Sequence, residues 1–310
     1  MAVKSGNALI RADDKSQAIV EMVLDGLDSP HSRRAYRRAL VDFMAWYRET
    51  GQTRLGKATV NAYRKQLLDQ GMGHSSVNQR LSAIRKLARE AADNGLLADR
   101  TANRIHRVKG VKQEGQRMGN WLDKEQAEAL LDAPDASTLK GKRDRALLAV
   151  LIGCGLRRQE VADLTVGHVQ QRAARWVIVD LVGKRNKTRT VPMPSWTKVL
   201  IDRWMQAAGI ESGRVFRPVN KGDKVTGERM SAQAIYNAVA RYVVALGFDS
   251  IAPHDLRRTF AKLAHKGGGA LDQIQLALGH ASLTTTERYL GVELDLANAP
   301  CDHLGLSVEL

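Results

Sequence analysis

Apolar residues recur at helical spacing through the first hundred residues, and this pattern predicts three helices. Their inward-facing residues are Tyr36, Leu40, Phe43 and Tyr47 in the first, Val60, Tyr63 and Leu67 in the second, and Val77, Leu81, Ile84, Leu87 and Ala91 in the third. We expect Ser32, Thr59 and either Ser75 or Ser76 to cap these helices, and Asn94-Gly95 to end the third. Residues 1–15 show no such pattern and are expected to be a loose tail, so an all-helical module is predicted over residues 16–100.

The second half of the chain adds strand-like alternation to helical periodicity. Asp123 and Gln126 have the spacing of a capping box, which predicts a helix over 124–131. Further helices are predicted over 142–164, broken near Gly153-Cys154-Gly155, and over 196–208, 231–246, 253–266, 271–278 and 284–290. Two alternating runs, 175–182 and 188–192, flank a basic tip and predict a β-hairpin. The fold class is therefore mainly α with a small antiparallel sheet, in two domains.

The charge of the chain indicates what kind of partner it binds. The chain has 310 residues, of which 44% are hydrophobic and 26% charged, and a formal net charge of +15. Such an excess favours a polyanionic partner over a small metabolite. The longest apolar run, 146–156, is too short to cross a bilayer, so no membrane is expected. The mixed charges of residues 1–17 are unlike a secretory signal, and two cysteines make no disulfide framework, so a cytoplasmic location is expected.

The basic residues concentrate in the first part of the chain, where residues 1–120 hold 22 Lys and Arg against 12 Asp and Glu. Residues 101–120 are basic, rich in glycine and weakly periodic, which predicts a linker between the two domains. The residues expected to contact nucleic acid are Arg80, Arg85, Lys86 and Arg89 on the outer face of the third helix, and Arg104, Arg107 and Lys109 in the linker. The alternatives are a solvated helix face and a solubilising tether.

The sequence lacks the common motifs for nucleotide binding and for metal binding. Walker A, GxGxxG and HExxH patterns are absent, and the eight histidines show no close metal-ligand spacing. The sequence thus supports neither an NTP-driven motor nor a metal-dependent nuclease, and neither a metal nor a cofactor is expected.

What remains is an ordered set of cations and one tyrosine. Arg157 and Glu160 stand in Gly-Leu-Arg-Arg-Gln-Glu, Lys184 in the hairpin tip Gly-Lys-Arg-Asn-Lys, His254 and Arg257 in His-Asp-Leu-Arg, His280 in Leu-Gly-His, and Tyr289 nine residues beyond. Each piece alone is weak, but order and spacing together resemble the tyrosine recombinase, or phage integrase, family over residues 16–292. The resemblance implies a SAM-like core-binding domain over 16–100 and an α+β catalytic domain of the DNA breaking-rejoining type over 121–292.

The resemblance also implies roles for these residues. Tyr289 would be the nucleophile that forms a 3′-phosphotyrosyl link, with Arg157 and Arg257 on the non-bridging phosphate oxygens. Lys184 would protonate the leaving 5′-oxygen, although Arg185 and Lys187 share its hairpin tip. The histidines would serve as a proton acceptor, His254, and a phosphate hydrogen-bond donor, His280, while Glu160 would orient its neighbours.

The implied partner is double-stranded DNA with inverted half-sites, bound by protomers that assemble into a tetramer. Residues 293–310 would form a tail that docks on a neighbouring protomer. Two other functions stay open from the residues: a type IB topoisomerase-like relaxase, and a non-catalytic DNA-binding regulator. The DNA sequence, the biological process and any accessory proteins are not indicated by the sequence.

Overall fold

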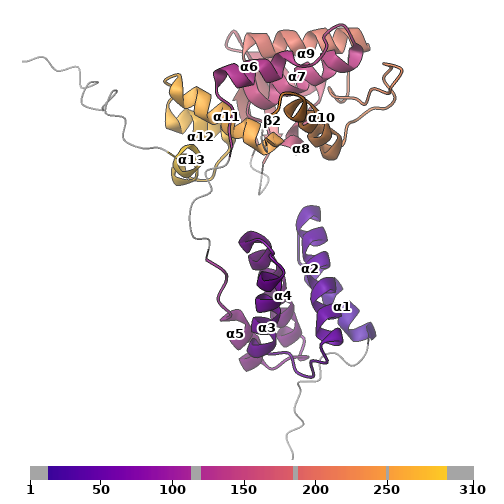
Figure 1. Cartoon of the computed structure of the whole chain (residues 1–310), viewed down its shortest axis with the longest axis vertical. Helices are drawn as coiled ribbons and strands as arrows, with labels where there is room; N and C mark the ends of the chain where they lie inside the picture. The colour runs from indigo at the N-terminus through magenta and orange to yellow at the C-terminus, as the bar shows by residue number, and fades with distance from the viewer. Residues whose placement is uncertain (1–12, 113–119, 184–187, 249–250, 292–310) are drawn as a thin grey trace, which may run out of the picture. The chain divides into compact units, whose positions relative to one another are not determined.

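A computed structural model describes residues 13–112, 120–183, 188–248 and 251–291 (Figure 1). The chain divides into two compact units, Met1–Gln116 and Arg117–Leu310. Along the described chain, no helix combines the length and the apolar character that a membrane span requires.

The first unit is helical throughout its described residues. Its helices are α1 (Asp13–Asp25), α2 (Pro30–Glu49), α3 (Lys57–Asp69), α4 (His74–Asp93) and α5 (Asp99–His106). Helix α4 packs against the other four, and its Leu81 and Ile84 are fully buried. Aromatic rings of α2 and α3 join the same core, with the Phe43 and Tyr63 ring centroids 5.1 Å apart. The predicted all-helical module is confirmed.

The helix starts differ from the predicted caps. Helix α2 begins at Pro30 behind Ser29, whose Oγ accepts from the backbone N–H of Ser32 at 3.5 Å. Proline suits the first helical position because its missing N–H has no intrahelical partner there, so the start moves ahead of Ser32. Helices α3 and α4 begin behind Gly56 and Gly73. The predicted end of α4 is correct: Asn94 is its C-cap, and Gly95 follows with φ +69°.

The basic segment predicted as a linker starts as part of the first unit. Residues 99–106 form α5, and Ile105 and Val108 are buried in the helical core. The Arg85 guanidinium donates to the Val108 carbonyl at 2.5 Å. The Asn78 amide donates to the carbonyl of Val111 at 2.9 Å and accepts from its N–H at 2.8 Å. Residues 101–111 therefore belong to the domain rather than to a linker, because apolar residues anchor them between exposed cations.

The second unit combines helices with one small sheet. Its elements are α6 (Lys124–Asp132), α7 (Leu139–Gly153), α8 (Arg158–Asp163), η1 (Val166–His168), β1 (Val169–Arg172), β2 (Arg175–Val182), β3 (Thr188–Pro192), α9 (Ser195–Ala208), α10 (Ala232–Ala245), α11 (Pro253–Lys266), α12 (Leu271–Leu278) and α13 (Leu283–Leu290). The sheet has the antiparallel order β1-β2-β3. The predicted hairpin and capping box are confirmed, whereas β1 was not predicted.

Helix α7 lies at the centre of the second unit. Its residues from Ala146 to Ile152 are all buried, and it packs against α6, α9, α10 and α11. A smaller apolar cluster joins α11, α12 and α13 through Ala261, Leu278 and Leu290. This cluster fixes the last three helices to one another and thereby positions Tyr289, the residue before Leu290.

Candidate active site

A glycine turn between α7 and α8 positions the first arginine. Gly155 has φ +59°, and a Cβ there would lie 2.5 Å from Cδ1 of Phe260. Only glycine combines the left-handed conformation with so close an approach. The turn delivers Arg157 as the N-cap of α8, where its backbone N–H donates to Oε2 of Glu160 at 2.7 Å.

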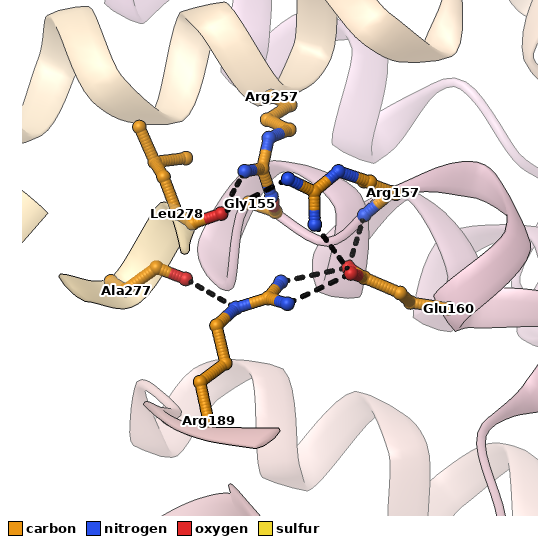
Figure 2. Close-up of polar contacts among 7 residues, drawn as sticks. All are labelled: Gly155, Arg157, Glu160, Arg189, Arg257, Ala277 and Leu278. Atoms are coloured by element: carbon orange, nitrogen blue, oxygen red, sulfur yellow. Dashed lines mark hydrogen bonds and ion pairs between the residues drawn. The ribbon is translucent and has the colours of Figure 1, made fainter. Parts of the chain in front are cut away.

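Glu160 is buried between two arginines (Figure 2). Arg157 Nη1 donates to its Oε1 at 2.8 Å, and the Arg189 guanidinium donates to both carboxylate oxygens at 2.8 Å each. With the Arg157 backbone N–H, these contacts fill all four acceptor positions of a carboxylate. Burial pushes the pKa of Glu160 upward, but hydrogen bonds and charge from Arg189, with those from Arg157, outweigh it and lower that pKa to about 2. Glu160 is therefore a fixed anion that orients guanidinium groups.

Arg257 enters the same cluster from α11. Its Nη1 donates to the Gly155 carbonyl at 2.6 Å, and its Nη2 donates to the Leu278 carbonyl. The residue is 1% exposed, whereas the Arg157 side chain is 32% exposed. Burial and the neighbouring charge of Arg157 lower the pKa of Arg257 to about 9, which still leaves it protonated at neutral pH.

The C-terminus of α12 gathers these three arginines. Arg189 Nε donates to the Ala277 carbonyl at 2.9 Å, while Arg157 and Arg257 share the Leu278 carbonyl (Figure 2). The last carbonyls of a helix lack intrahelical partners and carry partial negative charge, so cations stabilise them. Gly279 then turns the chain with φ +62° and leads directly into His280.

Tyr289 on α13 lies between the two candidate histidines. Its ring meets the imidazoles of His254 and His280 edge to face, with centroids 5.7 and 5.2 Å away. Its hydroxyl donates to the backbone carbonyl of His254 at 3.2 Å, not to the imidazole. The Arg258 guanidinium lies over the phenol ring, 4.7 Å from its centroid. Loss of water raises the pKa of Tyr289, and the cations Arg257 and Arg258 partly oppose that rise.

Both histidines are held toward the neutral form. Loss of surrounding water, then the charge of Arg257, lowers the pKa of His254, and the same causes lower that of His280 to about 4. His280 Nδ1 lies 3.1 Å from Thr286 Oγ1, a contact that leaves Nε2 as the nitrogen available to a ligand. A phosphate would offset the arginine charges and favour protonation of these rings.

The structure thus brings together six of the residues singled out in the sequence: Arg157, Glu160, His254, Arg257, His280 and Tyr289. Lys184 lies outside the described residues, as do the neighbouring candidates Arg185 and Lys187. Two cations of the cluster were missed, Arg189 and Arg258. A signal for Arg189 exists, because strand alternation places it on the same face as the buried Val191, and an inward arginine needs a partner.

The basic residues of the first unit fall into two groups. Arg80 pairs with Asp42 at 2.7 Å with its side chain 14% exposed, Lys86 pairs with Glu90 at 3.2 Å, and Arg85 binds the Val108 carbonyl. These three were predicted to contact nucleic acid from the outer face of the helix, but in the structure protein groups already hold them. The remaining four are exposed: Arg89, Arg104, Arg107 and Lys109.

The described part of the chain contains no group of three or more His, Cys, Asp or Glu residues close enough to hold a metal ion. Two acidic residues of this region, Glu160 in the cluster and Asp255 on α11, each contact an arginine. What the arrangement offers chemically is a phenol beside permanent cations, a combination suited to a phosphate diester.

Two family models match the chain. The Phage integrase family matches residues 120–294, and the Phage integrase, N-terminal SAM-like domain matches residues 24–95. Tyrosine recombinase XerC of Pelobacter propionicus is 32% identical over 274 residues, which cover 86% of this chain and 86% of that protein. Tyrosine recombinase XerD of Pseudomonas putida is 31% identical over 272 residues, covering 85% of this chain and 87% of that protein.

Solved structures show the same fold at lower identity. The XerH site-specific recombinase bound to palindromic difH substrate, a post-cleavage complex, has a TM-score of 0.68 at 18% identity, covering 91% of this chain and 82% of that one. A lambda integrase dimer bound to a COC' core site has a TM-score of 0.68 at 16% identity, covering 90% of this chain and 78% of that one. The cluster around Tyr289 lies within the segment that the family model matches, and the chain belongs to the phage integrase family of tyrosine recombinases, which are DNA strand-transferring enzymes.

Proposed function

We propose that the protein cuts and rejoins double-stranded DNA at specific sites through a phosphotyrosyl intermediate, without metal or ATP. The observation that carries this proposal is the position of Tyr289, whose phenol lies against His254, His280 and Arg258 and within the charge field of Arg157 and Arg257. The DNA-bound recombinase structures that share this fold support DNA as the substrate.

In the first step the Tyr289 oxygen attacks the phosphorus of the scissile diester. The new bond joins the phenol oxygen to the 3′-phosphate, and the bond to the 5′-oxygen breaks. The phenol proton must leave its contact with the His254 carbonyl, and the imidazole of His254 is the proposed acceptor. Because the phosphotyrosyl link replaces one ester by another, attack of a 5′-hydroxyl on it reseals the strand without an energy source.

Permanent cations take the place of metal ions in this scheme. Arg157 carries the more exposed guanidinium and would bind a non-bridging oxygen first, while Arg257 would supply N–H groups to the other non-bridging oxygen. Stabilising charge that develops on these oxygens is a large contribution to phosphoryl transfer. His280 would donate from Nε2, and Lys184 would protonate the departing 5′-oxygen.

We further propose that two protomers bind inverted half-sites and that a tetramer joins two duplexes, in the cytoplasm. Both structural units would contact the DNA, the first through its exposed cations. The tail over 293–310, proposed to dock on a neighbouring protomer, lies outside the described residues.

The test is a Tyr289→Phe variant on a duplex that carries a site selected by this protein from a random library. The wild-type protein should form a protein–DNA adduct that survives denaturation, and the variant should bind the duplex equally well yet form none, since only the nucleophilic oxygen is lost. Tyr236→Phe is the matched control, because Tyr236 is exposed on α10 and contacts Arg158 instead of the cluster.

An adduct that persists in Tyr289→Phe would contradict the assignment of the nucleophile. A wild-type protein that binds the selected duplex and never forms an adduct would contradict the proposed strand transfer and favour a regulator that only binds DNA. Relaxation of one bound duplex without strand exchange would instead favour a topoisomerase-like relaxase.

A further inference from the structure

We propose that Arg189 is a positioning residue for strand transfer, which holds Glu160 so that Arg157 keeps N–H groups free for the scissile phosphate. This inference rests on the proposed function. It concerns a residue on β3, the strand that follows the hairpin tip, which sequence motifs did not single out.

The geometry of Glu160 is the first step. Arg189 engages both carboxylate oxygens in a fork, through Nη1 to Oε1 and Nη2 to Oε2, each at 2.8 Å. The Arg157 side chain makes a single bond to the same carboxylate, through Nη1 to Oε1 at 2.8 Å. The two-bonded side-chain contact thus belongs to Arg189, whereas the Arg157 guanidinium bonds to one carboxylate oxygen and the Arg157 backbone N–H to the other. Among the described residues, the other acceptor near its guanidinium is the Leu278 carbonyl at 3.5 Å.

Charge is the second step. Arg157 and Arg189 contact Glu160, and Arg257 lies near enough for its charge to act on that carboxylate, so these four side chains together carry a formal excess of two positive charges. Without Arg189, two acceptor positions of the buried Glu160 carboxylate would be vacant. Leaving a buried anion without hydrogen-bond donors costs free energy, so another donor should take these positions. The nearest donor is the Arg157 guanidinium, which would then bond to both oxygens of Glu160. Glu160 would thereby compete with the phosphate for the same Arg157 N–H groups.

A third contact ties the arrangement to the turn that carries His280. Arg189 Nε donates to the Ala277 carbonyl at 2.9 Å, one residue before the Leu278 carbonyl that Arg157 and Arg257 share. The chain at Gly279 passes so close that a Cβ there would lie 2.8 Å from Cδ of Arg189. One side chain, itself 9% exposed, therefore fixes β3, α8 and the end of α12 to one another (Figure 2).

The experiment measures single-turnover adduct formation by Arg189→Gln on the selected duplex. The variant should bind DNA with near wild-type affinity and form the adduct at least about tenfold more slowly, because Arg157 is drawn onto Glu160. Adding Glu160→Gln should restore part of the rate, since a neutral amide no longer captures Arg157. Arg189→Lys should stay slow, because an ammonium keeps the charge but cannot make the fork and the Ala277 contact together.

A double-mutant cycle separates positioning from general stability. If Arg189 acts through Arg157, then Arg189→Gln should add little to the cost of Arg157→Ala. The matched control is Arg143→Gln, which removes another buried arginine whose carboxylate partner, Asp144 at 2.6 Å, lies outside the cluster. That control should lower the melting temperature and leave the adduct rate of the folded protein unchanged.

Several outcomes would overturn the inference. One is a wild-type adduct rate in Arg189→Gln or Arg189→Lys. Another is that Arg189→Gln slows the adduct rate as much in the Arg157→Ala background as in the wild type. A third is that adding Glu160→Gln to Arg189→Gln restores none of the rate. Should Arg189→Gln fail to fold, Arg189→Lys carries the same test with the charge retained. An active wild-type enzyme that is insensitive to Arg189 contradicts only this inference, whereas a wild-type protein without any adduct contradicts the proposed function.

Discussion

Arg157, which follows the Gly155 turn, and Arg257, which donates to the Gly155 carbonyl, differ in solvent exposure. The Arg157 side chain is 32% exposed, while Arg257 is 1% exposed and already donates to the carbonyls of Gly155 and Leu278. Arg257 is thus a structural cation in this state as well as a proposed ligand of phosphate. Its loss should harm folding as well as catalysis, because the buried Gly155 carbonyl would lose the Arg257 donor and the Leu278 carbonyl would keep only the 3.5 Å contact from Arg157.

The environment of Tyr289 leads to a prediction about pH. Arg258 lies 4.7 Å from the phenol ring and favours the phenolate, so Arg258→Gln should raise the pKa of Tyr289 further above its usual value. Because Tyr289 would then lose its proton less readily, the pH range in which the cleavage rate rises should shift to higher pH. Arg258→Lys keeps a cation and should leave that range near its wild-type position. An unshifted profile in Arg258→Gln would show that this charge does not act on the nucleophile.

Lys184 allows a prediction from chemistry, although its position lies outside the described residues. The 5′-oxygen leaves as an alkoxide about as basic as hydroxide, so its departure depends strongly on a proton donor. A bridging sulfur leaves as a thiolate with a pKa of ~8.5, by analogy with cysteine, and scarcely needs a proton. Lys184→Ala should therefore be slow on ordinary DNA and largely restored on a 5′-bridging phosphorothiolate duplex.

One control for Lys184 is Arg157, and the other is Lys187, which belongs to the same predicted hairpin tip. Arg157→Ala should stay slow on both duplexes, because it is proposed to act on the non-bridging oxygens. Rescue of Lys187→Ala in place of Lys184→Ala would move the acid three residues along the tip.

At the scale of elements, the α7–α8 turn is the feature on which Arg157 depends. Gly155→Ala would combine a left-handed alanine with a Cβ 2.5 Å from the Phe260 ring. We expect a loss of about 1–2 kcal/mol from the conformation, a further loss from the clash, and a slower adduct rate as Arg157 shifts. Thermal unfolding and single-turnover cleavage measure the two effects separately.

Gly209 is the matched control for Gly155. It ends α9 with φ +63°, and a Cβ there would meet no atom within 4 Å. Gly209→Ala should show the conformational loss alone, with cleavage of the folded protein unchanged. Equal stability and rate losses in the two variants would contradict a special role for the Gly155 turn.

Local signals explain which elements could be predicted from the sequence. Helices α11 and α12 were predicted to the residue, and the hairpin strands likewise, because caps, glycines and alternation mark their ends within a few positions. The start of α2 was missed since Pro30 and Ser29 together outweigh Ser32. Strand β1 was missed because its short polar segment, Val169–Arg172, becomes a strand only by pairing with β2.

Long-range contacts explain what could not be predicted. Arg189 meets Glu160 across 29 positions of sequence and Ala277 across 88, so the strand alternation can show that Arg189 faces inward but cannot show which groups it contacts. Helix α5 was read as linker because its charges are visible in the sequence, whereas the burial of Ile105 depends on the tertiary fold. The motif residues of the site could be named in advance, but the contacts that hold them could not.

At the scale of the whole molecule, the positive charge is concentrated in the first unit and the few residues that follow it. Residues 1–120 carry 22 of the chain's 48 Lys and Arg with 12 of its 33 Asp and Glu. The structure shows that these cations are not equivalent, because Arg80 and Lys86 already form ion pairs within the domain. Contacts with phosphates should therefore come from the exposed members.

That distinction gives a prediction about salt. Each phosphate neutralised by a protein cation contributes a slope of about −0.9 to the dependence of log affinity on log salt. Replacing four of the exposed cations, Arg89, Arg104, Arg107 and Lys109, by glutamine should shallow that slope by as much as about 3 to 4. Arg80→Gln should instead lower the melting temperature and barely change the slope, since its guanidinium pairs with Asp42 at 2.7 Å and is 14% exposed. Titrations of the selected duplex across salt concentrations measure the slopes. If the fourfold variant keeps the wild-type slope, these side chains are solvated and the first unit meets DNA, if at all, through another face.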